Sequence, residues 1–393
     1  MVACSAQADA QMKHTLFVVH RGGIQVPGAI RGTEACVLAF LRHLDRARFD
    51  PVILCNNDKH AEVFRAAGAE AHAFDVPEVM IEGTSWRLPL KRYSHALRRL
   101  DRFVRERGAG AFYISGGAPC QVVIPIAKRR RVPTILHFHH PSSKRNHQLW
   151  LTRFADRVIF PSEYTRSRTL ATAGIDGTVV YNGIDCRTLY TPATTRDAQW
   201  RLRHGIEDDD VVVGQVGAFS PNKRHDLLIE GFRRALARRR RLKLVLVGDG
   251  PERARMERLA AAGGLTEHVI FTGYVPRVAD FFRDTLDINV LASDEEGLGL
   301  VLLEGAACGL PGIGSDCSGI REAIRHGETG YLFRQDDPDS LAHDIVDLAN
   351  HPERRIAMGQ AARQWVESRF SEEHYASAIT AVVDDAIRSA HGK

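Results

Sequence analysis

Apolar strand patterns alternate with helical patterns along almost the whole chain. A first set of strand patterns ends near residue 181, and a second set begins at residue 211. Strands that alternate with helices form parallel sheets, because each helix carries the chain back along the sheet. The pattern therefore predicts an α/β protein. The expected strands are residues 15–20, 51–55, 70–74, 111–115, 134–138, 158–160, 178–181, 211–216, 243–247, 269–271, 288–291 and 312–314.

The length and the position of the polar segments predict two domains. A chain of 393 residues exceeds what one hydrophobic core usually supports. A polar segment with an acidic end, residues 186–210, lies between the two sets of strand patterns. Residues after 336 carry only helical patterns. We expect a flexible tail at residues 1–13, domains at residues 14–190 and 191–370, and a C-terminal helix within residues 371–393.

The composition is that of a soluble globular protein, with 44% hydrophobic and 26% charged residues. No apolar run reaches the ~18 residues that a membrane helix needs, and the N-terminus lacks the apolar centre of a signal peptide. Seven scattered cysteines without a C-x-x-C pair favour the cytoplasm. A net charge of +5 does not indicate a nucleic-acid partner.

The segment DEEGLGLVLLEGAACGLP, residues 294–311, follows an expected strand. It reads as a glycine loop that opens a helix, and the free N–H groups of a helix N-terminus attract phosphate. Glu296 precedes the glycines and Glu304 lies about one turn inside the helix, where its side chain leans back towards the loop. Carboxylates accept hydrogen bonds from hydroxyls. The combination suits a nucleotide sugar. The alternative is an ordinary strand–helix unit with both carboxylates in solvent.

The same segment resembles the Glu-x7-Glu motif of retaining glycosyltransferases with the GT-B fold, and most closely their family four. The resemblance extends over residues 15–370. It implies two Rossmann-like domains that face a central cleft, with the last helix crossing back to the N-terminal domain. It also implies that Glu296 contacts the donor sugar and Glu304 the ribose. The donor phosphates would lie near Gly297, Leu298, Gly299, Leu300 and Val301.

Further segments carry the same resemblance. VVYNGID, at residues 179–185, resembles the family's interdomain hinge, and VGDGPERARMERLA places Gly248 in the family's glycine turn after a strand. Tyr274 follows a strand where the family holds the nucleotide base, although a packing role suits this ring equally. RGTEACVL resembles the opening of the family's first helix, where Gly32 would let the backbone approach the donor phosphate. The pair Gly22–Gly23 is a rival for that role.

The segment VGAFSPNKRHDLLIEGF aligns with a family segment that carries an arginine and, five residues later, a lysine. The lysine is present as Lys223, whereas Ala218 replaces the arginine. A fixed cation beside a departing diphosphate lowers the barrier through preorganised electrostatics. We expect Lys223 to supply this charge, and Arg224 to be a donor-binding residue that could replace the absent arginine. The alternative for Lys223 is a surface lysine at the start of a helix.

Three histidines lie in ILHFHHP, at the end of an expected strand. Ligands bind at the C-terminal edge of parallel sheets. His139 takes the position of the family's active-site histidine, which contacts the donor sugar, and His137 reads as a core residue. Imidazoles are also metal ligands. No cysteine or carboxylate cluster accompanies them, so we expect no metal site.

Residues 91–107 form a basic amphipathic pattern with an apolar stripe at Tyr93, Leu97, Leu100 and Val104. We expect this helix to dock on the sheet with its arginines in solvent. Contact with a membrane surface is the alternative. The preceding segment, residues 75–89, has no clear periodicity and is expected to be a functional or mobile loop.

These observations predict a retaining, metal-independent glycosyltransferase without a further cofactor, and a UDP-sugar is the favoured donor. The resemblance implies front-face transfer to a hydroxyl, with the leaving phosphate helping to deprotonate the acceptor. The acceptor would be a soluble small molecule, such as an aminocyclitol natural product, or a glycan. Two alternatives remain, a catalytically silent nucleotide-sugar-binding protein and an epimerase or hydrolase of the same fold. The sequence indicates no oligomeric state.

Overall fold

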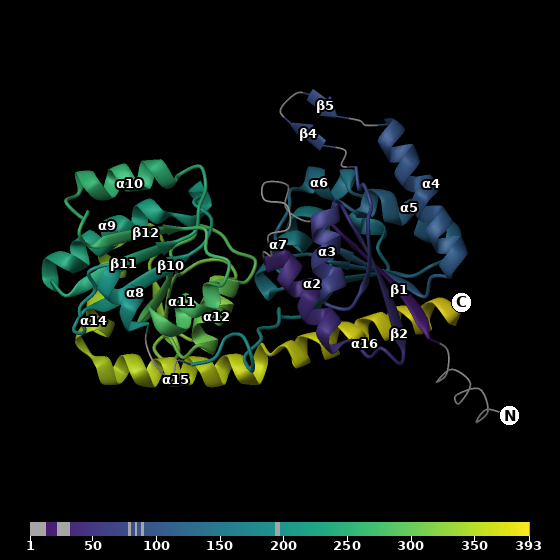
Figure 1. Cartoon of the computed structure of the whole chain (residues 1–393). Coiled ribbons are helices and arrows are strands. Elements are labelled where there is room, and N and C mark those ends of the chain that lie inside the picture. Colours follow the sequence, from purple (N-terminus) through teal and green to yellow (C-terminus); the bar gives the residue numbers. More distant parts are fainter. Residues whose placement is uncertain are drawn as a thin grey trace. The chain divides into compact units, whose positions relative to one another are not determined.

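The computed structural model describes residues 13–21, 32–77, 80–82, 85–87, 90–192 and 197–392. The chain forms two compact units, each built around a parallel sheet (Figure 1). The first unit combines the residues up to 183 with residues 372–393, and the second contains residues 184–371. The expected N-terminal tail and the pair Gly22–Gly23 lie outside the described residues, apart from residue 13.

The sheet of the first unit has seven strands in the order β3-β2-β1-β6-β7-β8-β9, all parallel. The central strands bury almost all of their residues, which are mostly apolar, because helices cover both faces of a sheet of this kind. The strand order reverses between β1 and β6, which is where α/β folds bind ligands. The strands are β1 (His14–His20), β2 (Phe49–Cys55), β3 (Glu70–Ala73), β6 (Ala111–Ser115), β7 (Thr134–His137), β8 (Arg157–Phe160) and β9 (Thr178–Val179).

The helices of the first unit include the last helix of the chain. α16 packs against α2, β6 and β7, and buries Tyr375 and Ile379 there (Figure 1). Its first residue, Glu372, accepts two hydrogen bonds from the Arg42 guanidinium. The helices are α2 (Gly32–His43), α3 (Asp58–Ala66), α4 (Leu90–Arg107), α5 (Cys120–Arg130), α6 (Lys144–Leu149), α7 (Glu163–Ala173) and α16 (Glu372–His391).

The second unit has a six-stranded parallel sheet in the order β12-β11-β10-β13-β14-β15, with its reversal between β10 and β13. The strands are β10 (Val211–Val216), β11 (Leu242–Val247), β12 (Val269–Gly273), β13 (Ile288–Leu291), β14 (Gly312–Ser315) and β15 (Gly330–Phe333). The helices are α8 (Ala198–Arg203), α9 (His225–Arg238), α10 (Arg253–Ala262), α11 (Val278–Asp284), α12 (Leu300–Ala307), α13 (Ile320–Ala323), α14 (Pro338–Asn350) and α15 (Pro352–Arg369).

Helix α4 docks on the first unit through its apolar stripe. Leu100 and Val104 are buried in the core, and Tyr93 and Leu97 pack against it. Its exposed arginines include Arg107, which pairs with Glu70. The docked arrangement agrees with the expected one. No described helix is both long enough and apolar enough to cross a bilayer.

The structure corrects three expectations. The first unit ends at residue 183 rather than 190, because the Ile184 N–H bonds the Phe370 carbonyl at 2.7 Å and Tyr190 packs on Phe282. Residues 75–89 contain an antiparallel pair, β4 (Met80–Glu82) and β5 (Ser85–Arg87), where no regular structure was expected. Strand β15 was also not expected, because its four residues follow a turn and offer little periodicity.

Candidate active site

The glycine loop between β13 and α12 ends where the sequence indicated. α12 begins at Leu300, directly after Gly299, whose φ of 87° lies in the left-handed region that favours glycine. No side chain of the described residues caps this helix. The first N–H groups of a helix have no partner inside it. The start of α12 therefore offers backbone donors, and its dipole favours an anion.

Lys223 and Glu296 meet at the edge of the sheet. Lys223 closes a short 3-10 turn (Pro221–Lys223) after β10, and Glu296 lies in the loop after β13. The Lys223 Nζ donates to Glu296 Oε1 at 2.5 Å. The Glu296 side chain is 10% exposed and the Lys223 side chain 20%. Two residues that the sequence assigned to the same ligand are thus brought together.

Gln215 stabilises the loop that carries Lys223. The sequence did not predict this residue as a part of the site. Its fully buried amide donates to the Lys223 carbonyl and accepts from the Ala292 N–H, both at 3.0 Å. The side chain therefore joins the loop after β10 to the end of β13. A polar amide inside the otherwise apolar strand VVVGQV was the signal in the sequence.

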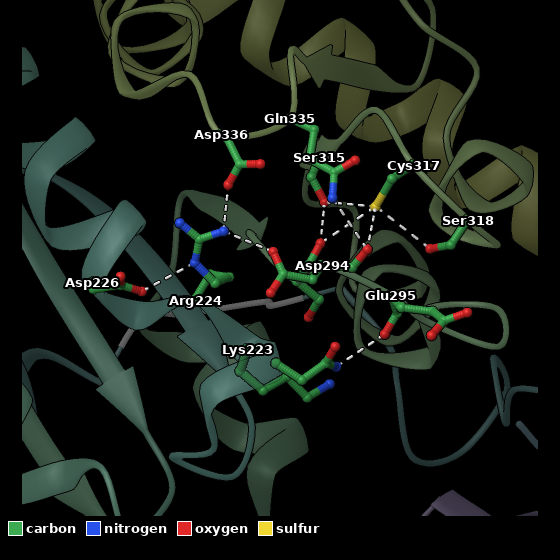
Figure 2. A network of polar contacts seen from close by, with 12 residues as sticks. Lys223, Arg224, Asp226, Asp294, Glu295, Ser315, Cys317, Ser318, Gln335 and Asp336 are labelled. Carbon is green, nitrogen blue, oxygen red and sulfur yellow. Dashed lines mark hydrogen bonds and ion pairs between the residues drawn. The ribbon is translucent and has the colours of Figure 1, made fainter.

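Arg224 has a different environment from Lys223. Figure 2 shows its guanidinium between the carboxylates of Asp226, Asp294 and Asp336. The hydrogen bonds to Asp336 and Asp294 raise the pKa of Arg224 above its ordinary value. Three carboxylates already compensate its single charge. We therefore interpret Arg224 as an ion-pair residue that joins three loops, rather than as the replacement for the arginine absent at Ala218.

A second loop, residues 316–319 after β14, supports the glycine loop. Ser318 Oγ accepts from the Glu296 N–H at 2.9 Å, and the Gly319 N–H donates to the Glu296 carbonyl at 3.2 Å. A Cβ on Gly319 would lie 2.3 Å from the Gly297 carbonyl oxygen. The backbone of Glu296 is therefore held on both sides. The sequence DCSG after an expected strand was the signal for this loop.

Glu304 lies about one turn inside α12 and forms a hydrogen bond with the Tyr190 hydroxyl. Burial raises the pKa of Glu304 to about 7, although Tyr190 and the charge of Lys223 act in the opposite direction. The carboxyl group therefore changes its protonation near neutral pH. Tyr190 lies in the segment that the sequence placed at the domain boundary, so its contact was not foreseen.

Two further predicted residues of the second unit, Gly248 and Tyr274, directly follow strands β11 and β12. Gly248 has a φ of 139°, and a Cβ there would lie 2.0 Å from the Gly217 carbonyl oxygen. Its N–H donates to the Gly273 carbonyl at 2.9 Å, which draws the two strand ends together. The Tyr274 side chain is 57% exposed, so its ring is open to a ligand. Leu298, within the glycine loop, is buried.

Gly32 and His139 belong to the first unit. Gly32 is exposed and begins α2. His139 is buried, and its Nε2 lies 2.9 Å from the Ser115 Oγ. His137 is fully buried with its Nδ1 at 2.6 Å from the Tyr113 hydroxyl, as suits a core residue. Among the described residues, no group of three or more histidine, cysteine, aspartate or glutamate side chains is arranged to hold a metal ion.

Comparisons with known proteins agree with this arrangement. Residues 30–188 match Glycosyltransferase Family 4, and residues 197–365 match Glycosyl transferases group 1. A GDP-mannose-dependent alpha-(1-6)-phosphatidylinositol monomannoside mannosyltransferase of Mycolicibacterium smegmatis is 30% identical over 285 residues, 68% of this chain and 74% of that protein. N-acetyl-alpha-D-glucosaminyl L-malate synthase of Bacillus anthracis is 33% identical over 209 residues, 53% of this chain and 54% of that protein.

Solved structures show the same fold. HepE of Anabaena, determined in complex with UDP and glucose, superposes with a TM-score of 0.81 at 19% identity, covering 95% of this chain and 100% of that one. A glycosyltransferase of Rickettsia africae gives a TM-score of 0.80 at 16% identity, covering 95% and 99% of the two chains.

Proposed function

Because this chain belongs to the glycosyltransferases of family four and group 1, with the GT-B fold, we propose that it transfers a sugar from a nucleoside diphosphate sugar to an acceptor hydroxyl. The observation that carries the proposal is the Lys223–Glu296 pair beside the uncapped start of α12. These groups offer a cation, a carboxylate and backbone donors at one edge of the second sheet.

The parts of a nucleotide sugar match these groups by chemistry. An ammonium group has three N–H donors, and Glu296 accepts one of them, so Lys223 retains donors for a diphosphate. The backbone N–H groups at Leu300 and Val301 would bind the same diphosphate. Glu296 would accept hydrogen bonds from sugar hydroxyls, and Glu304 from the ribose. Gly32 and His139 remain candidate donor-binding residues of the first unit.

The proposed transfer retains the anomeric configuration and needs no metal. Lys223 and the amides of α12 stabilise the charge that develops on the leaving diphosphate, which is the work that a divalent cation does elsewhere. The leaving phosphate takes the proton of the acceptor hydroxyl on the same face. Full activity in excess EDTA is therefore expected. Loss of transfer in EDTA, restored by magnesium or manganese, would contradict this part of the proposal.

Binding experiments can identify the nucleotide base of the donor, and transfer experiments can identify the acceptor. A thermal-shift panel would compare UDP, GDP, UDP-glucose and GDP-mannose. A ligand at 100 times its dissociation constant adds ~2.7 kcal/mol to the stability of the protein. A UDP-sugar is our first candidate, and the mannosyltransferase relative makes GDP-mannose the matched alternative.

Transfer would then be followed with the stabilising donor, and the anomeric configuration of the product would be read by NMR. Acceptors to test include an inositol glycoside, malate and an aminocyclitol. Binding without transfer or donor hydrolysis would favour a silent nucleotide-sugar-binding protein. Epimerised donor, or hydrolysis that no acceptor diverts, would favour the epimerase or hydrolase alternative.

A further inference from the structure

Four buried polar side chains form a continuous chain of hydrogen bonds in the first unit, and their combined action has no place in the proposal above. Glu34 Oε1 lies 3.1 Å from His20 Nε2, and His20 Nδ1 lies 3.0 Å from Ser115 Oγ. Ser115 Oγ lies 2.9 Å from His139 Nε2. The four residues are between 1% and 8% exposed. His20 and Ser115 end the neighbouring strands β1 and β6, at the reversal of the strand order.

The Glu34 carboxylate determines the direction of the first hydrogen bond in this chain. Burial raises the pKa of Glu34, but the hydrogen bonds that its carboxylate accepts, that from His20 foremost, act against burial, and the pKa is lowered to about 2. An ionised carboxylate only accepts hydrogen bonds. His20 Nε2 must therefore carry a hydrogen and donate it to Glu34.

The remaining hydrogens follow from this end. In a neutral His20, the Nδ1 then carries a lone pair and accepts from the Ser115 hydroxyl. The hydroxyl has only one hydrogen, so its oxygen accepts from His139 Nε2–H. His139 Nδ1 is left with a lone pair. The opposite direction requires a doubly protonated His20 imidazolium.

His139 Nδ1 is the open end of the chain. It is buried, and among the described residues it has no hydrogen-bond partner. Burial and the neighbouring His137 hold the pKa of His139 well below its ordinary value, so the imidazole is neutral. A buried acceptor without a donor is costly, and a ligand hydroxyl would remove that cost.

We propose that Glu34, His20 and Ser115 are positioning residues that hold His139 in its Nε2–H tautomer, so that His139 Nδ1 accepts a hydrogen bond from a substrate hydroxyl. The substrate part of this inference rests on the proposed function. The tautomer part does not, because it concerns only the protein's own hydrogen bonds, with His20 neutral. It also explains why three polar residues are buried beside the sheet where apolar ones would pack.

The tautomer can be measured on the wild-type protein without substrate. Long-range ¹H–¹⁵N correlation of ¹⁵N-histidine-labelled protein distinguishes a protonated ring nitrogen from one with a lone pair. The His139→Gln variant assigns the signal by its disappearance. We expect protonated Nε2 and unprotonated Nδ1 in His139. The reverse tautomer, or an even mixture of both, would overturn the proposal whether or not the protein transfers sugar.

Variants at Ser115 then connect the tautomer to function. Ser115→Ala should produce a mixture of His139 tautomers and lower kcat/KM for the donor about tenfold, the size of one hydrogen bond. Ser115→Thr keeps a hydroxyl and should restore both. Tyr113→Phe is the matched control, because it removes a buried hydroxyl from the same strand that bonds His137 instead. It should leave the His139 tautomer unchanged.

The two readouts separate failure of this inference from failure of the proposed function. Absence of any transfer, with the expected tautomer in place, would count against the transferase proposal alone. Normal transfer by Ser115→Ala, with an unchanged His139 tautomer, would overturn only the inference that Glu34, His20 and Ser115 position His139.

Discussion

Lys223 and Glu296 lie 73 residues apart in the sequence, yet Nζ and Oε1 are 2.5 Å apart in the structure. Each follows one of the two strands at the reversal of the second sheet, β10 and β13. Each side chain therefore holds the other in position for the part of the nucleotide sugar that we propose it binds.

Replacement of Lys223 by alanine tests its assigned role. If the ammonium stabilises the leaving diphosphate, its contribution is larger in the transition state than in the ground state. Lys223→Ala should lower kcat by about a hundredfold, or ~3 kcal/mol, and change KM for the donor much less. Steady-state kinetics at varied donor concentration measures both. A rise in KM with unchanged kcat would assign Lys223 to ground-state binding only.

Arg224→Ala is the comparison variant for Lys223 and has an expected outcome of its own. The guanidinium holds Asp226, Asp294 and Asp336 together, and its removal leaves three carboxylates near one another. These side chains are partly exposed, so we expect a loss of only ~1–2 kcal/mol in the free energy of unfolding. Urea denaturation of the variant measures this loss. kcat should fall by less than about threefold. A loss of kcat comparable with that of Lys223→Ala would show that Arg224 acts on the phosphate after all.

The pKa of Glu304 predicts a pH-dependent affinity for the nucleotide sugar. Burial raises this pKa to about 7 in the free protein. Ribose hydroxyls would donate to the carboxylate, so binding favours the ionised form and releases a proton. The affinity should therefore rise with pH up to about 7 and then level off, with a slope of at most about tenfold per pH unit below 7. Calorimetry from pH 5.5 to 8.5 measures it.

Glu304→Gln supplies the control for this pH profile. The amide keeps the shape of the side chain but does not titrate, so the pH dependence between 6 and 8 should disappear. The affinity should fall by ~1–3 kcal/mol at pH 8, because hydrogen bonds to a charged acceptor are lost. An intact nucleotide sugar is the proper ligand, since the terminal phosphate of a free nucleotide itself titrates near pH 6. The same profile in wild type and variant would remove Glu304 from the ribose site.

Much of the fold was predictable from the sequence because apolar periodicity is a local property. Strand β10 was predicted residue for residue, and a helix was predicted directly after the glycine loop, where α12 begins at Leu300. β15 and the pair β4–β5 were missed, because three or four residues contain too little pattern. The unit boundary was misplaced by seven residues, since Ile184 is assigned by its bond to Phe370 rather than by its neighbours in sequence.

The candidate site, too, was predictable only where its residues lie close together in the sequence. The motif containing Glu296 and Glu304 is contiguous, and the structure places Lys223 beside Glu296. Partners that come from other strands could not be seen in the sequence. Ser318 and Tyr190 contact the motif, and Gln215 contacts Lys223, only because the fold brings these residues to one edge of the sheet. The roles of all these residues remain predictions.

Gly319 tests whether the loop after β14 controls the nucleotide loop. Its Cα has an ordinary φ of −66°, so backbone conformation does not require glycine there. Space does, because a Cβ would lie 2.3 Å from the Gly297 carbonyl oxygen and 2.8 Å from the Leu298 Cα. Both neighbours are backbone atoms, so the glycine loop itself must move.

Gly319→Ala should therefore lower the affinity for a nucleotide sugar by about tenfold or more, together with ~1–3 kcal/mol of stability from overpacking. Titration calorimetry and urea denaturation measure the two effects separately. Gly263→Ala is the matched control, because its Cβ would meet no heavy atom closer than 3.4 Å. That variant should bind as the wild type does. Full affinity in a folded Gly319→Ala protein would mean that the glycine loop is not held by the loop of residues 316–319, and that α12 alone positions the phosphate donors.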